Sequence, residues 1–219
     1  MATGTIEVVI EATPKRAFAR AIDWPGWARS GKTAALALEA LAAYAPRYAE
    51  AAKAAGVAFS PVRYEVVEET GGGGGTDFGV PSVIADADRR PVTVADAKRL
   101  AGLVEAAWAV FDEVAAIAPL ALRKGPRGGG RDRDKMVAHV NESDGYYARE
   151  VGVRQKPPDT TDRAAIEAMR AAVVEVLSRP SDGSPLAERT WTPRYAAARI
   201  AWHALDHAWE MEDRSEPAS

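Results

Sequence analysis

The sequence contains no cysteine, only three histidines, and no marked excess of charge of either sign. Without cysteine, disulfides, thiolate nucleophiles and cysteine metal sites are excluded, so histidine, aspartate and glutamate remain as metal ligands. The formal net charge of −3 is too small for a polyelectrolyte, and composition therefore does not favour nucleic acid as a partner. A site in this chain has to be built from histidines and carboxylates.

Long hydrophobic runs are also missing from the sequence. No apolar stretch approaches the ~20 residues that a membrane-spanning helix needs, so we expect no membrane partner. The first residues show no apolar run between a basic start and a small-residue cleavage site, and we expect no signal peptide. The lack of cysteine agrees with a cytoplasmic location. With 219 residues, the chain is long enough for one large or two small domains with a buried core.

The first seventy residues predict a small ββαβ unit. Residues 5–11 and 17–24 alternate apolar with polar side chains, which predicts two strands paired as a hairpin. Residues 33–56 are rich in alanine and leucine and predict a helix that Pro46 kinks or divides. Residues 62–69 return to a strand pattern.

After residue 70 the character of the chain changes. Glycines 71–75 predict a flexible linker, which we extend over residues 71–90. Residues 91–219 show no further strand signal and predict a bundle. Four helical segments are expected in it, at 93–118, 131–152, 160–178 and 192–213. The predicted fold class is therefore α+β, with a unit at 1–70 followed by a four-helix bundle, whose core is able to hold a metal on facing helices.

Two of the three histidines lie in the last predicted helix. His203 and His207 are four residues apart, which places their Cβ atoms about 5–6 Å from each other on one helix face. His139 lies in the predicted helix at 131–152. Three histidines from two helices form the open coordination shell of catalytic zinc, and the set also suits nickel or ferrous iron. The alternative is that all three are ordinary histidines at the helix surface.

Two further groups of residues surround this candidate metal site. Glu142, Asp206 and Glu210 each lie within one helical turn of a histidine and are candidates to orient an imidazole or complete the coordination. Alternatively they are solvated, or paired with Arg199 or Arg214. A glycine-rich basic loop precedes the helix that carries His139. It is expected to fold over the site and bind an anionic substrate through Arg123, Arg127 or Arg131, unless it is simply a solvated loop.

Residues 26–33 (GWARSGKT) match the nucleotide-binding P-loop pattern letter for letter. A P-loop domain also needs a mostly parallel sheet with a later acidic magnesium ligand, and few strand signals follow residue 69. Trp27 and Arg29 are bulky for a loop that closes on phosphates. Nucleotide binding is therefore a third hypothesis. No Ser-His-Asp triad is expected, since every histidine belongs to the candidate metal site.

The strand pair, the Pro25-Gly26 turn, Gly31-x-Thr33 and the alanine- and leucine-rich helix after it resemble the HicB-like antitoxin fold over about residues 5–69. In that family the unit is a binding and scaffolding module, and no catalytic residue is carried over.

The four predicted helices, with one histidine on the second and HxxxH on the last, resemble the DinB-like superfamily over about residues 85–219. This superfamily includes bacterial thiol-dependent transferases and the mycothiol-dependent maleylpyruvate isomerase. The resemblance implies a divalent-metal triad of His139, His203 and His207. It also implies that the metal binds and deprotonates a low-molecular-weight thiol, because a cation lowers the pKa of a coordinated thiol or water.

The leading hypothesis is therefore a metal-dependent thiol transferase or isomerase with zinc or nickel, or else iron. Its partners are a small-molecule thiol and an anionic or electrophilic second substrate, and a homodimer is compatible with the pattern. The alternative is a non-catalytic module that is stabilised by its metal, with the HicB-like unit as the partner-binding half.

Overall fold

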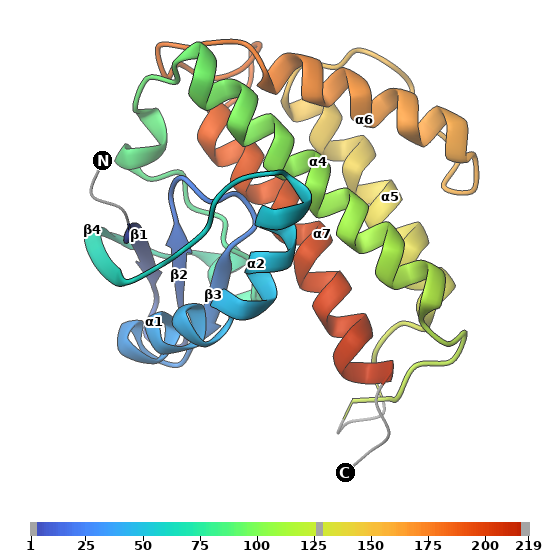
Figure 1. Ribbon diagram of the computed structural model, residues 1–219, viewed down its shortest axis with the longest axis horizontal. Coiled ribbons are helices and arrows are strands. Elements are labelled where there is room, and N and C mark those ends of the chain that lie inside the picture. Colours follow the sequence, from blue (N-terminus) through green and yellow to red (C-terminus); the bar gives the residue numbers. More distant parts are fainter. Residues whose placement is uncertain (1–3, 126–128, 216–219) are drawn as a thin grey trace.

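The computed structural model describes residues 4–125 and 129–215, which form a mixed α+β protein (Figure 1). Its N-terminal part contains one four-stranded sheet with the order β3-β2-β1-β4. Strand β1 (Thr5–Ala12) pairs antiparallel with β2 (Ala17–Ala21), which pairs antiparallel with β3 (Ala28–Gly31). Strand β4 (Arg63–Gly71) runs parallel to β1. Parallel neighbours need a crossover connection, and two helices supply it.

The crossover helices are α1 (Ala34–Ala43) and α2 (Ala45–Ala54). The expected single helix divides at Tyr44, and Pro46 lies in the first turn of α2, where a missing backbone N–H costs nothing. The predicted α+β class is confirmed, but the N-terminal part has a third strand that the ββαβ prediction missed. This strand, β3, is only four residues long and falls inside the stretch that matches the P-loop pattern.

The glycine-rich segment after β4 is more ordered than a flexible linker. It contains the short helix α3 (Gly74–Phe78) and the 3₁₀ helix η1 (Asp86–Arg89). The reason is a buried carboxylate on β1, because Glu11 accepts hydrogen bonds from the Thr76 hydroxyl at 2.8 Å and from the backbone N–H groups of Ser82 and Val83 at 3.1 and 3.0 Å. These three bonds attach residues 76–83 to the sheet.

The four predicted C-terminal helices are present, with ends a few residues from the expected ones. They are α4 (Val94–Ile117), α5 (Arg133–Glu150), α6 (Arg163–Leu177) and α7 (Pro193–Ser215). Thr93 begins α4 with a capping box, in which its hydroxyl accepts from the Asp96 N–H at 3.1 Å. Helix α7 packs against both α4 and α5, and Figure 1 shows α4 and α7 running side by side across the molecule.

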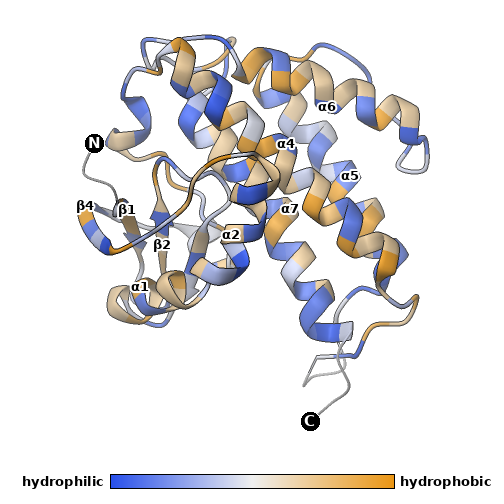
Figure 2. Cartoon of the chain, viewed as in Figure 1, coloured by the Kyte–Doolittle hydropathy of each residue, from blue (hydrophilic) through white to orange (hydrophobic). Residues whose placement is uncertain are grey.

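The sheet and the helices share one hydrophobic core. Buried side chains from the two parts, among them Trp27, Tyr48, Phe111 and Trp209, belong to a single cluster. Figure 2 shows polar residues interspersed along the same helices, as expected for helices with one buried face. Among the described residues, none of the helices combines the length and the apolar character needed to cross a bilayer.

Residues 26–33 contribute to this core. The Trp27 ring is fully buried and stacks on Tyr48 with ring centroids 5.2 Å apart. Gly26 has a φ of +92° and lies so close to α7 that an added Cβ would be 2.7 Å from Leu205 Cδ1. Thr33 is the N-cap of α1, since its hydroxyl accepts from the Leu36 N–H at 3.3 Å.

Candidate metal centre

The three histidines come together where α5 meets α7. His139 projects from α5, and His203 and His207 project from successive turns of α7. One ring nitrogen from each lies within 4.8 Å of the other two, so the three are close enough to bind one metal ion. The Nε2 atoms of His139 and His203 are 3.2 Å apart. Two nitrogens bound at ~2.0–2.1 Å to one tetrahedral zinc are about 3.3 Å apart, so this spacing fits a shared cation.

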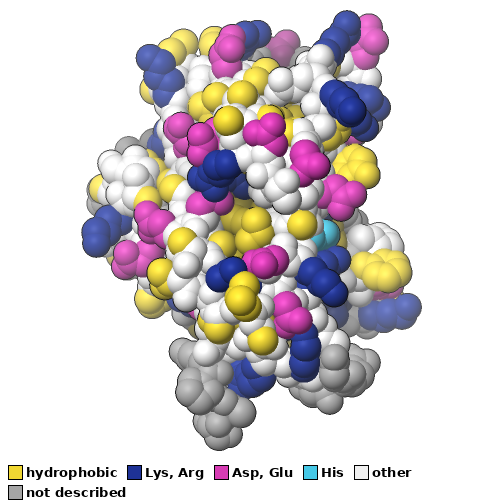
Figure 3. Space-filling view, turned by 90° about the vertical axis from the view of Figure 1, so that its right-hand side faces the viewer, with side chains coloured by type: hydrophobic (Ala, Val, Ile, Leu, Met, Phe, Trp, Pro, Cys, Tyr) yellow, Lys and Arg dark blue, Asp and Glu magenta, His cyan; other side chains and the backbone are white. Residues whose placement is uncertain are grey.

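The packing around the histidines places them at the edge of the core. Near His139 on α5, Met136 and Val140 are buried, and near the two histidines of α7, Ala204 and Ala208 are buried. His203 is 6% exposed, whereas His139 and His207 are partly exposed. The space-filling view shows a histidine at the surface among apolar and basic side chains (Figure 3). The cluster is thus held by the core and is still reachable from solvent.

Of the three predicted neighbouring carboxylates, Glu210 contacts a histidine. Its Oε2 lies 3.0 Å from His207 Nδ1, and its Oε1 accepts from Arg214 at 2.6 Å. The hydrogen bond from His207 and then that from Arg214 lower the pKa of Glu210, while burial opposes the shift. A charged carboxylate on Nδ1 fixes the ring and leaves Nε2 free for a metal, which is the usual second-layer arrangement around ligating histidines.

Asp206 and Glu142 have other surroundings. Asp206 forms an ion pair of 2.8 Å with Arg29 of β3, and burial raises the pKa of its carboxyl against the opposing charge of Arg29. Glu142 is exposed to solvent. Among the described hydrogen bonds, neither carboxylate reaches an imidazole.

The electrostatics of the cluster favour neutral imidazoles. Burial lowers the pKa of His139 to about 4, and the charges of Arg131 and His207 act in the same direction while Glu210 opposes them. Burial also lowers the pKa of His203 far below its usual value, helped by His207 and Arg199. Metal binding requires deprotonated imidazoles, so both rings are in the ligating form at neutral pH.

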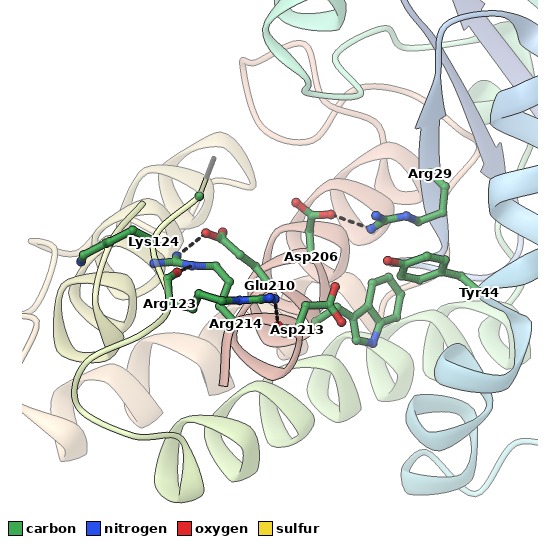
Figure 4. Close-up of a pocket in the computed structure, with 10 residues that line it drawn as sticks. Arg29, Tyr44, Arg123, Lys124, Asp206, Glu210, Asp213 and Arg214 are labelled. Carbon is green, nitrogen blue, oxygen red and sulfur yellow. Dashed lines mark hydrogen bonds and ion pairs between the residues drawn. The ribbon is translucent and has the colours of Figure 1, made fainter. Parts of the chain in front are cut away.

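A cavity of about 660 Å³ adjoins the cluster (Figure 4). Glu210 belongs to both, because it lines the cavity and bonds to His207. The walls come from β3, from the junction of α1 and α2, from the loop after α4 and from α7, with Arg29, Tyr44, Arg123, Lys124, Gly125, Asp206, Trp209, Glu210, Asp213 and Arg214. Its volume lies in the range of small-molecule sites, about 300–1,000 Å³.

The basic loop lies beside this site. Arg123 lines the cavity, where its guanidinium donates to the Asp213 carbonyl at 2.6 Å and its own carbonyl accepts from Arg214 Nε at 2.7 Å. Arg131 is exposed, but its charge acts on the pKa of His139 and of His203. Arg127 lies outside the described residues.

Two residues that sequence reasoning did not place in the site also contact it. The Tyr147 ring is edge-on to His203 at 5.6 Å between centroids. The Arg199 guanidinium carbon lies 5.2 Å from the Tyr147 ring and 4.8 Å from the Trp202 ring. The available signal was the spacing of Arg199, His203 and His207, which puts all three on one stripe of α7.

Comparisons with protein-family models, curated proteins and solved structures find no match. The resemblances to the HicB-like and DinB-like families therefore remain predictions, and the chemistry has to be argued from the histidine cluster itself.

Proposed function

We propose that this protein is a divalent-metal-dependent enzyme that uses a low-molecular-weight thiol as a transferase or isomerase. The observation that carries the proposal is the convergence of His139, His203 and His207 from two helices, with no fourth ligand in the group among the described residues. Structural zinc sites are closed by four protein ligands, whereas catalytic sites keep a position for water or substrate. A three-histidine set therefore supports an enzyme over a module with a structural metal.

The residues of the site fit such a metal. Imidazole suits zinc and nickel, and also ferrous iron. The low pKa values of His139 and His203 keep their lone pairs available, and Glu210 orients His207. A divalent cation held by His139, His203 and His207 would lower the pKa of a thiol or water bound to it and so would make a nucleophile available at neutral pH.

The adjoining cavity is the proposed place for the second substrate. Its cationic side chains favour an anionic or electrophilic molecule, as expected for the basic loop. Asp206, Glu210 and Asp213 line the same cavity, so the cations are partly neutralised and the substrate has to compete with these carboxylates. Trp209 and Tyr44, in contact at 5.2 Å between ring centroids, offer an apolar surface.

Elemental analysis tests the metal site. The wild-type protein is expected to bind one equivalent of metal and His203→Ala to lose it, while Glu142→Ala, a change at an exposed carboxylate on α5, keeps it. Stoichiometric metal in His203→Ala would contradict the site. Cobalt substitution then tests the open position, because a thiol that coordinates cobalt adds a charge-transfer band and a closed four-ligand site does not.

Thiol consumption tests catalysis. With a panel of small thiols and an aryl halide as the electrophile, the metal-loaded wild type is expected to accelerate the reaction above the rate of His203→Ala. Equal rates in the two proteins would favour the non-catalytic module.

A further inference from the structure

Three buried nitrogens next to the histidine cluster have no hydrogen-bond partner among the described residues. They are Arg199 Nη1, Trp202 Nε1 and His203 Nδ1. The last is a donor when Nε2 is the ligating atom, because a neutral imidazole then carries its proton on Nδ1. The Trp202 and His203 side chains are 4% and 6% exposed, whereas Arg199 is half-buried and faces solvent in part. Among the described residues, four other buried side-chain atoms lack a partner, and they lie elsewhere: Trp108 Nε1, Asp144 Oδ1, Arg194 Nε and Arg214 Nη2. The three near the histidines are grouped within little more than one turn of α7, and this grouping favours an acceptor at that place.

The charge of Arg199 specifies what kind of acceptor this is. Among the described residues, the arginines with buried side chains otherwise have carboxylate partners: Arg20 with Asp88, Arg170 with Asp144 and Asp112, and Arg194 with Asp23. Within residues 4–125 and 129–215, Arg199 has no carboxylate within ion-pair distance, and it lies against the rings of Tyr147 and Trp202 instead. Contacts with aromatic rings do not use the N–H donors of the guanidinium, so this charged group is still able to bind an anion.

Arg199 lies close enough to the histidine cluster for one ligand to reach both. Arg199 precedes His203 by one helical turn, about 5.4 Å along the axis of α7. The Tyr147 ring packs against both residues, since it lies 5.2 Å from the Arg199 guanidinium carbon and 5.6 Å from the His203 ring centroid. Arg199 as a whole is only half-buried, so a ligand that enters from solvent reaches the guanidinium.

We infer that Arg199, with Trp202 Nε1 beside it, binds a carboxylate carried by the ligand that coordinates the metal. The inference rests on the proposed function and narrows it, because it selects thiols that bear an anionic group over neutral ones. Arg199 is then the residue that determines specificity, separate from the cavity lined by Arg123 and Glu210.

The test uses the cobalt-loaded protein and three probes: 3-mercaptopropionate, 2-mercaptoethanol and propionate. Binding is followed in the visible spectrum of the cobalt ion. The wild type is expected to bind 3-mercaptopropionate about 10- to 100-fold more tightly than 2-mercaptoethanol, the effect of one charge-assisted hydrogen bond. Arg199→Met is expected to lose this preference, and Arg199→Lys to keep part of it.

Arg149→Met is the matched control, since Arg149 is an exposed arginine on α5 whose guanidinium lies 5.9 Å from the Tyr146 ring. It is expected to leave the preference unchanged. Equal binding of the two thiols by the wild type, or a preference that survives in Arg199→Met, would overturn the inference. Thermal melts of both Arg199 variants identify any loss of folding, and Arg199→Lys gives the answer if Arg199→Met does not fold.

The proposed function fails in a different way, when the wild type binds no cobalt or when no thiol changes the cobalt spectrum. In that case calorimetry with propionate on the metal-free protein measures the anion site by itself. Binding that depends on Arg199 supports the anion site without the metal chemistry, and its absence overturns both.

Discussion

Helix α5 carries a polar cluster on each of two faces, and the two clusters differ in how completely they are paired. Toward α6 and α4, Arg170 is bonded through all three nitrogens, to Asp144 at 3.1 Å, to Asp112 at 3.0 Å and to Asn141 at 3.2 Å. Toward α7, His139 meets two other histidines, and Nη1 of the neighbouring Arg199 has no acceptor in the part of the chain that the structure describes. In the first cluster the Arg170 guanidinium is bonded to side chains of the protein, although Asp144 Oδ1 and Trp108 Nε1 have no partner among the described residues. In the second cluster the three histidines lie close enough to bind one metal ion. The two clusters therefore differ in whether their arginine has a carboxylate partner among the described residues.

Burial has opposite consequences in the two clusters. It raises the pKa of Asp144 to about 6, and Arg170 and the Trp108 indole N–H oppose the shift. It lowers the pKa of His139 and His203. In each case the neutral form is favoured, but a neutral aspartic acid weakens its ion pair while a neutral imidazole gains the lone pair that a metal uses.

The largest expected effect comes from breaking the paired cluster. Arg170→Met leaves the Asp144 carboxylate buried without its main counter-charge and is expected to lower the free energy of unfolding by about 3–5 kcal/mol. Urea unfolding at pH 7 measures it. Arg179→Met is the control, since Arg179 forms an exposed pair with Glu175 and its removal is expected to cost less than about 1 kcal/mol. Similar costs for both variants would contradict the view that Arg170 completes a structural cluster.

The next largest effect is expected from adding a divalent cation to the histidine cluster. A divalent cation at about 100 times its Kd is expected to raise the free energy of unfolding by about 2.7 kcal/mol, because it binds the folded chain. For a chain of this length, such a gain raises the Tm by several degrees. Thermal melts with zinc or nickel, followed by a chelator, measure the gain and its reversal. An equal rise in His203→Ala would place the stabilising metal elsewhere.

The pH dependence of stability isolates Asp144. Its pKa is about 6 in the folded chain against about 3.9 when unfolded, so its contribution is greatest below pH 4 and is lost as the pH rises through 6. Relative to Asp144→Asn, the wild type is expected to lose about 2 kcal/mol between pH 4 and pH 7. Urea titrations across this range provide the measurement. Parallel pH profiles for the two proteins would show that Asp144 titrates normally.

The smallest expected effect concerns the orientation of His207. Glu210→Gln removes the carboxylate charge from Nδ1 and is expected to weaken metal binding about tenfold. Glu212→Gln is the matched control, because this residue lies two positions along α7 and pairs with Arg47 at 2.6 Å instead. Calorimetric zinc titrations compare the two variants. An unchanged affinity in Glu210→Gln would mean that the hydrogen bond does not orient the ligand.

The sequence predicted most of the helices and named all three histidines, His139, His203 and His207, as metal-ligand candidates. The spacing of His203 and His207 is a property of one helix, and the cap at Thr93 depends on residues three positions apart. Contacts between distant residues were not predictable in this way. Asp206 pairs with Arg29, 177 residues away, although Arg199 and Arg214 were the partners expected from the sequence.

The missed strand and the glycine segment have the same cause. Strand β3 has only four residues, too few for alternation to identify, and it is fixed by pairing with β2. The glycine segment is fixed by the carboxylate of Glu11 on β1. In both places tertiary partners decide the local structure, and a single sequence does not reveal such partners.

Gly26 belongs to the stretch that matches the P-loop pattern, but in the structure it packs against α7, the helix that carries His203 and His207. An added methyl group at this turn would meet both Leu205 and Ala201 on α7. Ala201 comes before His203, and Leu205 lies between His203 and His207. The positive φ adds its own penalty for any other residue. Replacing this glycine would therefore displace the helix that bears His203 and His207, and so a position more than 170 residues upstream helps to set where these two histidines lie relative to His139.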